Sequence, residues 1–338
     1  MSAQDRGRFV WHELNTTDPS AAERFYRGIT GWGIQPFEHN PSYRMWTASG
    51  VPQGGLMVLP EQAKQMGAPP HWLPYLGVEN VDATVRQATT LGAKTYVAPQ
   101  DIPNGGRFSV LADPQGAVFA VHSAANPMPG AEGAPKLGEF SWHELVTTDA
   151  QAAWDFYQAL FGWAKMDAMD MGPQGTYQMF GRGRFMYGGM YNKAANVPAP
   201  PSWLSYVLVP SVDAVLSKVT AGGGKIVNGP MDVPGNDRVV MCVDAQGAAF
   251  ALHSKGAVVA KSPAPKAAPS EPKPQPKPQP KAKAKAKPKA KAKAKPRKTA
   301  KAKPKARAKA KAKPRAKAKP KAKARARSKP KKKARAKK

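Results

Sequence analysis

Apolar and polar residues alternate in short runs near the start of the chain, and each run is bounded by turn-forming residues. The alternation at residues 9–14 predicts a β-strand, because side chains of a strand point to opposite faces in turn. Asp18 followed by Pro19 is typical of a helix N-cap and first turn, so we expect a short amphipathic helix that ends near Gly31. Further strands are expected at residues 32–37, 43–48 and 55–59. Together these elements make one β-α-β-β-β unit.

The same order of elements follows at once. The expected elements are a strand at residues 72–78, a helix at 81–91, and strands at 94–97, 107–111 and 118–122. The last two strands are joined by D-P-Q-G, which has Pro and Gly where type I turns favour them. Two paired units would close eight strands around a cup with the helices outside. Small cups of this kind are natural ligand pockets.

The whole pattern recurs with an offset of 131 residues. The run W-H-E-L-N-T-T-D at 11–18 returns as W-H-E-L-V-T-T-D at 142–149, and other matches keep the same register over about 110 residues. Such a register indicates duplication of a whole domain. We therefore expect an α+β protein with two tandem domains, each made of two paired β-α-β-β-β units in an eight-stranded cup. The expected ranges are domain 1 at 7–124, a linker at 125–137, domain 2 at 138–255 and a tail at 256–338.

Charge separates the tail from the body. The chain has 338 residues and a formal charge of +31, yet residues 255–338 hold 36 of its 53 basic residues and one of its 22 acids. Residues 1–254 therefore have 17 basic and 21 acidic residues, a net charge of −4. The tail is almost entirely Lys, Ala, Pro and Arg, a composition that cannot bury an apolar core and predicts disorder.

The tail is expected to bind DNA or another polyanion without reading base sequence, because it has dense positive charge and no aromatic residue. The alternative is a solubilising extension. The composition resembles that of linker-histone tails. Representative candidate contacts to phosphate are Lys281, Lys283, Lys285, Arg297, Lys298, Arg315, Arg325, Arg327, Lys331, Lys332 and Lys333.

The single cysteine, Cys242, lies in an apolar run and is expected to be a buried structural thiol. The first residues have no signal-peptide pattern, and no apolar run approaches the length of a membrane span. These features predict a cytoplasmic protein that does not enter a membrane and that associates with the nucleoid if the tail binds DNA.

Two motifs give the chain a family resemblance. These are D-x-x-x-A-x-x-F-Y, at 18–26 and again at 149–157, and D-P-Q-G-A-x-F at 113–119. With them the chain resembles the vicinal oxygen chelate superfamily, which includes glyoxalase I, bleomycin-resistance proteins and extradiol dioxygenases. More narrowly, it is similar to bacterial tandem glyoxalase-like proteins of actinobacterial type.

The resemblance implies where metal ligands would stand in this chain. Those positions hold Trp11, Leu73, Ala120, Trp142, Leu204 and Ala251. None of these side chains offers a lone pair suited to a metal, so the resemblance implies the fold and argues against the usual metal. We expect no metal and no other cofactor.

Other side chains could form a ligand pocket on the same strand faces. The candidates are Trp11, Glu13, Tyr75, His122, Trp142, Glu144, Tyr206 and His253. The aromatic residues could stack on a flat ligand or simply fill the cavity of a lost metal. His122 and His253 could be strand ends that are solvated or singly hydrogen bonded. Alternatively, the Glu and His residues could form a shifted metal site that includes His71, or a metal-free acid–base pair. His12 and His143 fall on the opposite face, as hydrogen-bonded histidines at the core edge.

Three functions compete on this basis. The first is a metal-free protein that binds a small organic molecule and is tethered to nucleic acid by its tail. The second is a glyoxalase- or dioxygenase-type enzyme with a noncanonical Glu/His site. The third is a nucleoid-associated protein whose folded body only supports assembly. We assign no catalytic residue from sequence and expect the two domains to pair within one chain.

Overall fold

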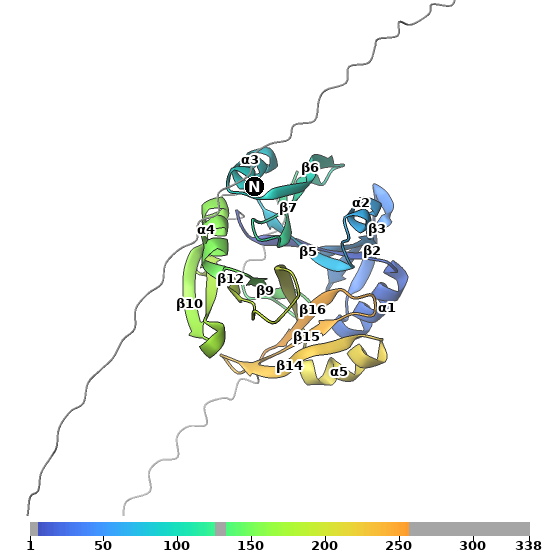
Figure 1. The fold of residues 1–338 in the computed structure, drawn as a ribbon. Helices are drawn as coiled ribbons and strands as arrows, with labels where there is room; N and C mark the ends of the chain where they lie inside the picture. The colour runs from blue at the N-terminus through green and yellow to red at the C-terminus, as the bar shows by residue number, and fades with distance from the viewer. Residues whose placement is uncertain (1–5, 126–132, 257–338) are drawn as a thin grey trace, which may run out of the picture. The chain divides into compact units, whose positions relative to one another are not determined.

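The computed structural model describes residues 6–125 and 133–256. The predicted tail, and most of the predicted linker, lie outside the described residues. The rest forms two eight-stranded sheets with helices (Figure 1).

The first sheet contains the two predicted β-α-β-β-β units. Its elements are β1 (Phe9–Thr16), α1 (Pro19–Thr30), β2 (Gly33–Phe37), β3 (Asn40–Ala48), β4 (Val51–Val58), α2 (Glu61–Gln65), β5 (His71–Gly77), α3 (Val81–Thr90), β6 (Lys94–Ile102), β7 (Gly106–Ala112) and β8 (Val118–Ser123). Helix α1 begins as predicted, because the Asp18 side chain accepts hydrogen bonds from the backbone N–H groups of Ser20 and Ala21. It ends where Gly31 adopts a left-handed conformation, with φ of 74°. Helix α2 was not predicted, and none of its residues is buried.

The second sheet repeats this plan. Its elements are β9 (Phe140–Thr147), α4 (Ala150–Phe161), β10 (Ala164–Asp170), a 3₁₀ turn (Gly172–Gln174), β11 (Thr176–Arg182), β12 (Phe185–Asn192), β13 (Ser202–Leu208), α5 (Val212–Ala221), β14 (Lys225–Val233), β15 (Asp237–Val243) and β16 (Ala249–Ser254).

The two sheets have the same topology. The strand orders are β2-β3-β4-β1-β5-β8-β7-β6 and β10-β11-β12-β9-β13-β16-β15-β14. The first strands of the two units, β1 and β5, pair antiparallel at the centre, and each also pairs in parallel with the last strand of its own unit. The predicted fold of two tandem cups is thereby confirmed.

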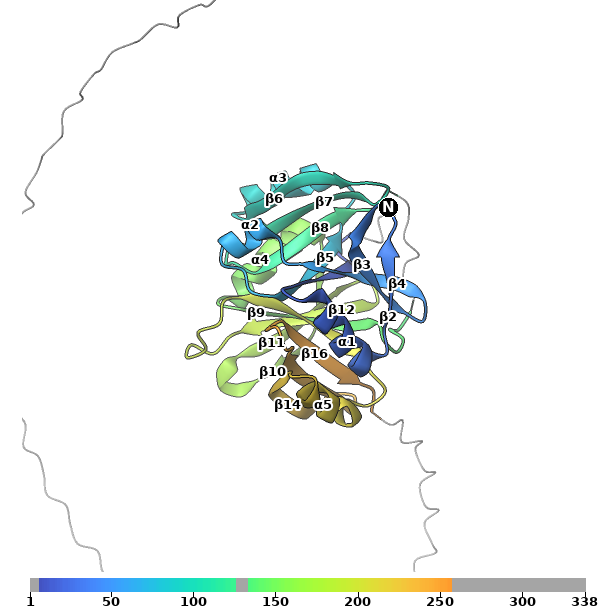
Figure 2. The same ribbon diagram turned by 90° about the vertical axis from the view of Figure 1, so that its right-hand side faces the viewer.

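The two domains pair through large apolar cores that contain residues of both. The ring of Phe25 on α1 packs against Phe250 of the second sheet, with 5.7 Å between centroids. Reciprocally, Phe156 on α4 packs against Phe119 of the first sheet at 6.2 Å. Helix α1 lies beside α5 and α4 beside α3, and the two sheets meet between these helices (Figures 1 and 2). Pairing of the domains within one chain is therefore confirmed.

Polar groups also cross the domain interface in matched pairs. The Tyr26 hydroxyl donates to Asp244 Oδ2 at 3.0 Å, and the Tyr157 hydroxyl donates to Asp113 Oδ2 at 3.1 Å. Each aspartate also caps its own turn, accepting backbone N–H bonds through Oδ1. The aspartates of the D-P-Q-G and D-A-Q-G turns therefore stabilise both the turn between two strands and the contact with the other domain.

His12 and His143 meet at the centre of this interface. Their Nε2 atoms are 2.7 Å apart, and Phe9 and Phe140 stack on the two rings. Burial lowers the pKa of His143 to about 3 and holds the pKa of His12 well below its ordinary value, so both rings are neutral. One ring donates its proton and the other accepts it. Both histidines are hydrogen bonded, as predicted. Their bond lies between the two domains and not at the edge of a single core.

No helix of the described residues is long and apolar enough to cross a membrane. Cys242 is buried and burial raises the pKa of its thiol to about 11, which fits a structural thiol.

Candidate functional site

The concave face of each sheet holds its own cluster of side chains. We call these faces cup 1 and cup 2. Cup 1 is lined by Val10, Trp11, Leu73, Tyr75, Phe108, Val110, Val118 and Ala120. Cup 2 is lined by Trp142, Leu204, Tyr206, Met231, Val233, Val239, Met241 and Ala251.

The positions that would ligate the family's metal do not fit a metal. Trp11 pairs with Tyr75 across the strands, and Tyr75 pairs in turn with Ala120. In cup 2 the row is Trp142, Tyr206 and Ala251. Within residues 6–125 and 133–256 no group of three or more His, Cys, Asp or Glu residues is placed to hold a metal ion.

A buried carboxyl group occupies cup 1 together with aromatic hydrogen-bond donors. The indole N–H of Trp11 donates to the Tyr43 hydroxyl at 2.9 Å, and this hydroxyl donates to Glu13 Oε2 at 2.9 Å. Asn15 Nδ2 donates to the other oxygen, Oε1, at 3.2 Å. Burial raises the pKa of Glu13, while hydrogen bonds from Tyr43, Asn15 and Tyr75 oppose the rise. Both oxygens of Glu13 are thus satisfied within the protein.

Cup 2 repeats the donors but leaves one oxygen unpaired. Trp142 Nε1 donates to the Tyr177 hydroxyl at 2.7 Å, and the hydroxyls of Tyr177 and Tyr206 donate to Glu144 Oε2 at 3.1 and 3.2 Å. Oε1 is buried and has no hydrogen-bond partner among the described residues. Residue 146, the equivalent of Asn15, is a valine and cannot donate.

The unpaired oxygen belongs to a carboxyl group with unusual acidity. Glu144 is only 5% exposed, and burial raises its pKa to about 7, opposed by the hydroxyl groups of Tyr177, Tyr206 and Tyr191. Tyr177 and Tyr206 donate to Oε2, whereas the nearby Tyr191 hydroxyl does not meet Oε1 in hydrogen-bonding geometry. Near neutral pH this group is present in both protonation states. It can therefore accept a hydrogen bond from a ligand or exchange a proton with it.

Tyr43 and Tyr177, which donate to the two carboxyl groups, were missed from sequence, whereas Tyr206, which also donates to Glu144, was among the candidates. Tyr43 and Tyr177 are equivalent in the structure, but they are 134 residues apart and not 131. A comparison at one fixed offset therefore does not align them. Each has room because a glycine faces it: a Cβ on Gly55 would lie 1.9 Å from the Tyr43 hydroxyl, and a Cβ on Gly189 would lie 1.9 Å from the Tyr177 ring. Paired glycines opposite a tyrosine are the signal that could have revealed them.

The two histidines at the ends of β8 and β16 differ in their partners. His122 Nε2 bonds to the carbonyl oxygen of Gly105 at 2.9 Å, and its Nδ1 is buried without a partner. His253 bonds through both nitrogens, to Ser141 Oγ and to Asp237 Oδ2, each at 2.9 Å. His122 is a singly hydrogen-bonded strand-end group. The partners of His253 were not anticipated.

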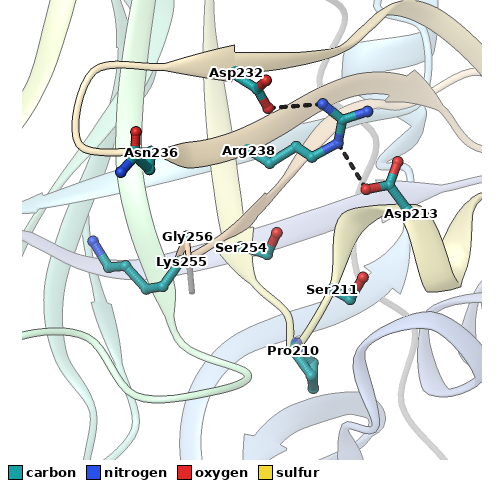
Figure 3. A pocket seen from close by; sticks show the side chains of 9 residues that line it. All are labelled: Pro210, Ser211, Asp213, Asp232, Asn236, Arg238, Ser254, Lys255 and Gly256. Atoms are coloured by element: carbon teal, nitrogen blue, oxygen red, sulfur yellow. Dashed lines mark hydrogen bonds and ion pairs between the residues drawn. The ribbon is translucent and has the colours of Figure 1, made fainter. Parts of the chain in front are cut away.

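A separate polar cavity of about 460 Å³ lies beside the N-terminus of α5 (Figure 3). Arg238 spans it, pairing with Asp213 and Asp232 at 2.7 Å each. Because Ser254 lines the cavity and is adjacent to His253 on β16, alternation places the cavity on the opposite face from cup 2. Arg107 makes the same two ion pairs in domain 1, so the arrangement belongs to the repeated fold.

Family models match both halves of the chain. A model described as glyoxalase-like domain matches residues 11–122, and one described as glyoxalase/bleomycin resistance protein/dioxygenase superfamily matches residues 139–252.

Curated relatives span the whole folded body. The chain is 32% identical over 249 residues to the putative glyoxylase CFP32 of Mycobacterium tuberculosis, covering 72% of this chain and 92% of that protein. It is 29% identical over 261 residues to the anthracycline biosynthesis protein DnrV of Streptomyces peucetius, covering 73% and 92%.

Solved structures at lower identity share the fold. Homoprotocatechuate 2,3-dioxygenase of Brevibacterium fuscum is 15% identical with a TM-score of 0.55, covering 75% of this chain and 82% of that one. The 2,3-dioxygenase LapB of Pseudomonas sp. KL28 is 11% identical with a TM-score of 0.51, covering 75% and 94%. Together with the paired cups, these matches show that the chain belongs to the glyoxalase/bleomycin resistance protein/dioxygenase superfamily as a tandem two-domain member.

Proposed function

We propose that this protein binds a small organic molecule in cup 2 without a resident metal, and that its basic tail tethers it to nucleic acid. The observation that carries the first part is the unpaired Oε1 of Glu144. A buried acceptor without a partner costs free energy of about 1–3 kcal/mol, and a ligand that donates to it recovers that cost.

The lining of cup 2 supports a flat and mostly apolar ligand with an O–H or N–H group. Trp142 offers an indole face, and Met231 and Met241 are flexible apolar side chains that adapt to irregular shapes. Val239 stands where cup 1 has Phe108, and Met241 stands where cup 1 has Val110, so the linings of the two cups differ in shape. The name of the DnrV relative refers to anthracycline biosynthesis, so an anthracycline is the first probe.

The test is a titration of anthracycline fluorescence with the full chain and two matched variants. Glu144→Gln removes the charged acceptor, and we expect affinity to fall by about 10- to 100-fold because a charge-assisted hydrogen bond is lost. Glu13→Gln changes the equivalent carboxyl in cup 1, and we expect little effect. Equal losses in both variants, or none in Glu144→Gln, would contradict the assignment of the ligand to cup 2.

An enzyme of glyoxalase or dioxygenase type with a noncanonical Glu/His site is the second candidate. It is favoured by the pKa of Glu144 near 7, because a general acid or base works best when its pKa lies near the working pH. Release of a chemically altered probe would support this candidate, whereas recovery of the probe unchanged would support binding alone.

The proposal for the tail depends on charge alone. If about ten of its basic residues contact phosphate at once, affinity for DNA should fall with nearly the ninth power of salt concentration. A salt titration on two unrelated DNA sequences, with the full chain and with residues 257–338 removed, measures this. Equal binding by the truncated body, or a strong preference for one sequence, would refute the proposal and its nucleoid association.

A further inference from the structure

A β-bulge in β9 turns one extra side chain toward cup 2. Phe140 pairs with Val207 and Trp142 with Tyr206, so Ser141 is the additional residue on its strand. The equivalent bulge in β1 leaves Val10 in the cluster of cup 1. Bulges re-aim side chains and are frequent beside active sites. Ser141 therefore faces cup 2 and is partly accessible.

Ser141, His253 and Asp237 form a continuous chain of hydrogen bonds. The carboxylate of Asp237 can only accept, so His253 Nε2 must donate to it across the 2.9 Å contact. In the neutral ring His253 Nδ1 then has the free lone pair, and it accepts the O–H proton of Ser141 at 2.9 Å. A second and longer contact of 3.4 Å joins Ser141 Oγ to the carbonyl oxygen of Tyr206.

The charges around these hydrogen bonds suit His253 to remove the serine proton. Burial and the nearby Lys255 ammonium lower the pKa of His253 below its ordinary value, although Asp237 raises it, and this favours the neutral ring near pH 7. Burial alone would raise the pKa of Asp237, but hydrogen bonds from Lys255 Nζ, His253 and the backbone N–H of Gly256 leave it below its ordinary value. The ring is thus a free base held in one orientation by an ionised carboxylate.

We infer that Ser141 is an activated nucleophile that attacks the carbonyl carbon of esters bound in cup 2. As the Ser141 Oγ–carbon bond forms, the serine proton passes to His253 Nδ1. The bond from carbon to the alcohol oxygen then breaks, and His253 gives the proton to the leaving alcohol. Water attacks the acyl-serine with His253 as base, releasing a carboxylic acid and restoring the serine hydroxyl.

The first domain has the same fold but lacks this arrangement, so the fold does not require it. Cup 1 keeps the histidine as His122, but it has Val10 in place of Ser141 and Gly106 in place of Asp237. The fold therefore forms without the serine and the aspartate. The apolar lining of cup 2, with Leu204, Met231 and Met241, suits esters whose acyl or alcohol part is apolar.

The experiment uses an alkyl fluorophosphonate on the full chain, because the many lysines of the tail would react directly with activated esters. The serine oxygen displaces fluoride from phosphorus, and peptide mass spectrometry identifies the labelled residue. We expect Ser141 to be labelled, at a rate that rises with pH through the titration of His253 and then levels off.

Variants test the roles of the partners. His253→Asn should slow labelling roughly 10²- to 10⁴-fold, as loss of a general base does. Asp237→Asn, which keeps the shape but frees the ring to change tautomer, should also slow it clearly. Ser141→Ala should abolish it, and each variant should keep the far-ultraviolet circular dichroism of the parent.

A matched control comes from cup 1. Val10→Ser places a serine beside His122 without an aspartate, and we expect no second label. Steady hydrolysis of 4-methylumbelliferyl butyrate, after subtraction of the Ser141→Ala rate, should follow the same ranking of variants. The inference is overturned if Ser141 is not labelled, if His253→Asn is labelled as fast as the parent, or if Val10→Ser gains an equally reactive serine.

Discussion

Cup 1 and cup 2 descend from one duplicated sequence and hold the same Trp–Tyr–Glu network of hydrogen bonds. The two cups differ in the partners of their Glu and His side chains. In cup 1 the carboxyl of Glu13 is completed by Asn15, and the strand-end His122 bonds to the Gly105 carbonyl oxygen through Nε2. In cup 2 Glu144 Oε1 lacks a partner, and His253 is aligned by Asp237. The Trp–Tyr–Glu part is common to both cups, and the cups differ in which buried acceptor lacks a partner.

In a duplicated protein, function is to be sought where the two repeats differ. A satisfied buried network contributes to stability and restricts the chain to one structure. An unsatisfied buried acceptor lowers stability, and each cup has one in a different place: His122 Nδ1 in cup 1 and Glu144 Oε1 in cup 2. The two cups therefore serve as each other's controls.

The largest expected effect tests the part that the cups share. Gly55→Ala and Gly189→Ala each place a Cβ inside the volume of a tyrosine that holds the buried carboxyl. Moving that tyrosine breaks its bond to Glu13 or Glu144 and overpacks the strands, so we expect about 2–5 kcal/mol of destabilisation in each case. Urea unfolding measures this, and a loss below about 1 kcal/mol in either variant would show that the tyrosine can move without cost.

The next effect concerns the acidity of Glu144. The pKa of Glu144 is about 7 in the folded protein and 4.5 in the unfolded chain, so the folded protein holds an extra proton between pH 4.5 and pH 7. The free energy of unfolding therefore falls as the pH rises from 4.5 to 7. The loss should approach about 3 kcal/mol. Glu144→Gln should remove this part of the pH dependence, while Glu13 retains its own. An unchanged slope of unfolding free energy between pH 4.5 and pH 7 would mean that the carboxyl is not held protonated.

A smaller effect is expected when the residue types at the equivalent positions 15 and 146 are exchanged. Asn15→Val removes the donor to Glu13 Oε1 and should cost about 1–3 kcal/mol while raising the pKa of Glu13 further. Val146→Asn offers a donor to Glu144 Oε1, so it should lower the pKa of Glu144 and weaken binding of the anthracycline probe. Thermal unfolding and probe titration measure the two outcomes. Tighter probe binding by Val146→Asn would argue against ligand donation to Oε1.

The smallest expected effect is that of metal removal. Because Trp11 and Trp142 stand at the first ligand position of each cup, we expect no metal to be needed for folding. Thermal melts of residues 1–254 with and without a chelator should coincide. A clear fall in melting temperature on chelation would show that the body depends on a metal.

Local signals made most of the fold predictable. Period-two alternation, the Asp18 cap, the Gly31 terminator and the D-P-Q-G turn act over a few residues, and the structure realises each of them. The candidate site was predictable in part. Strand alternation placed Trp11 and Glu13 on one face, and the structure joins both to Tyr43. Tyr43 itself, on a strand 30 residues from Glu13, had no local signal.

The duplicated β-α-β-β-β plan and the separation of a basic tail from an acidic body follow from residue identities and short spacings. The family resemblance added that the metal-ligand positions hold residues such as Trp11 and Ala120. The contact of Ser141 with His253, 112 residues away, and the unpaired oxygen of Glu144 emerge only in the folded protein. Such contacts depend on strand order and on a single bulge, which bring together residues that no local pattern relates.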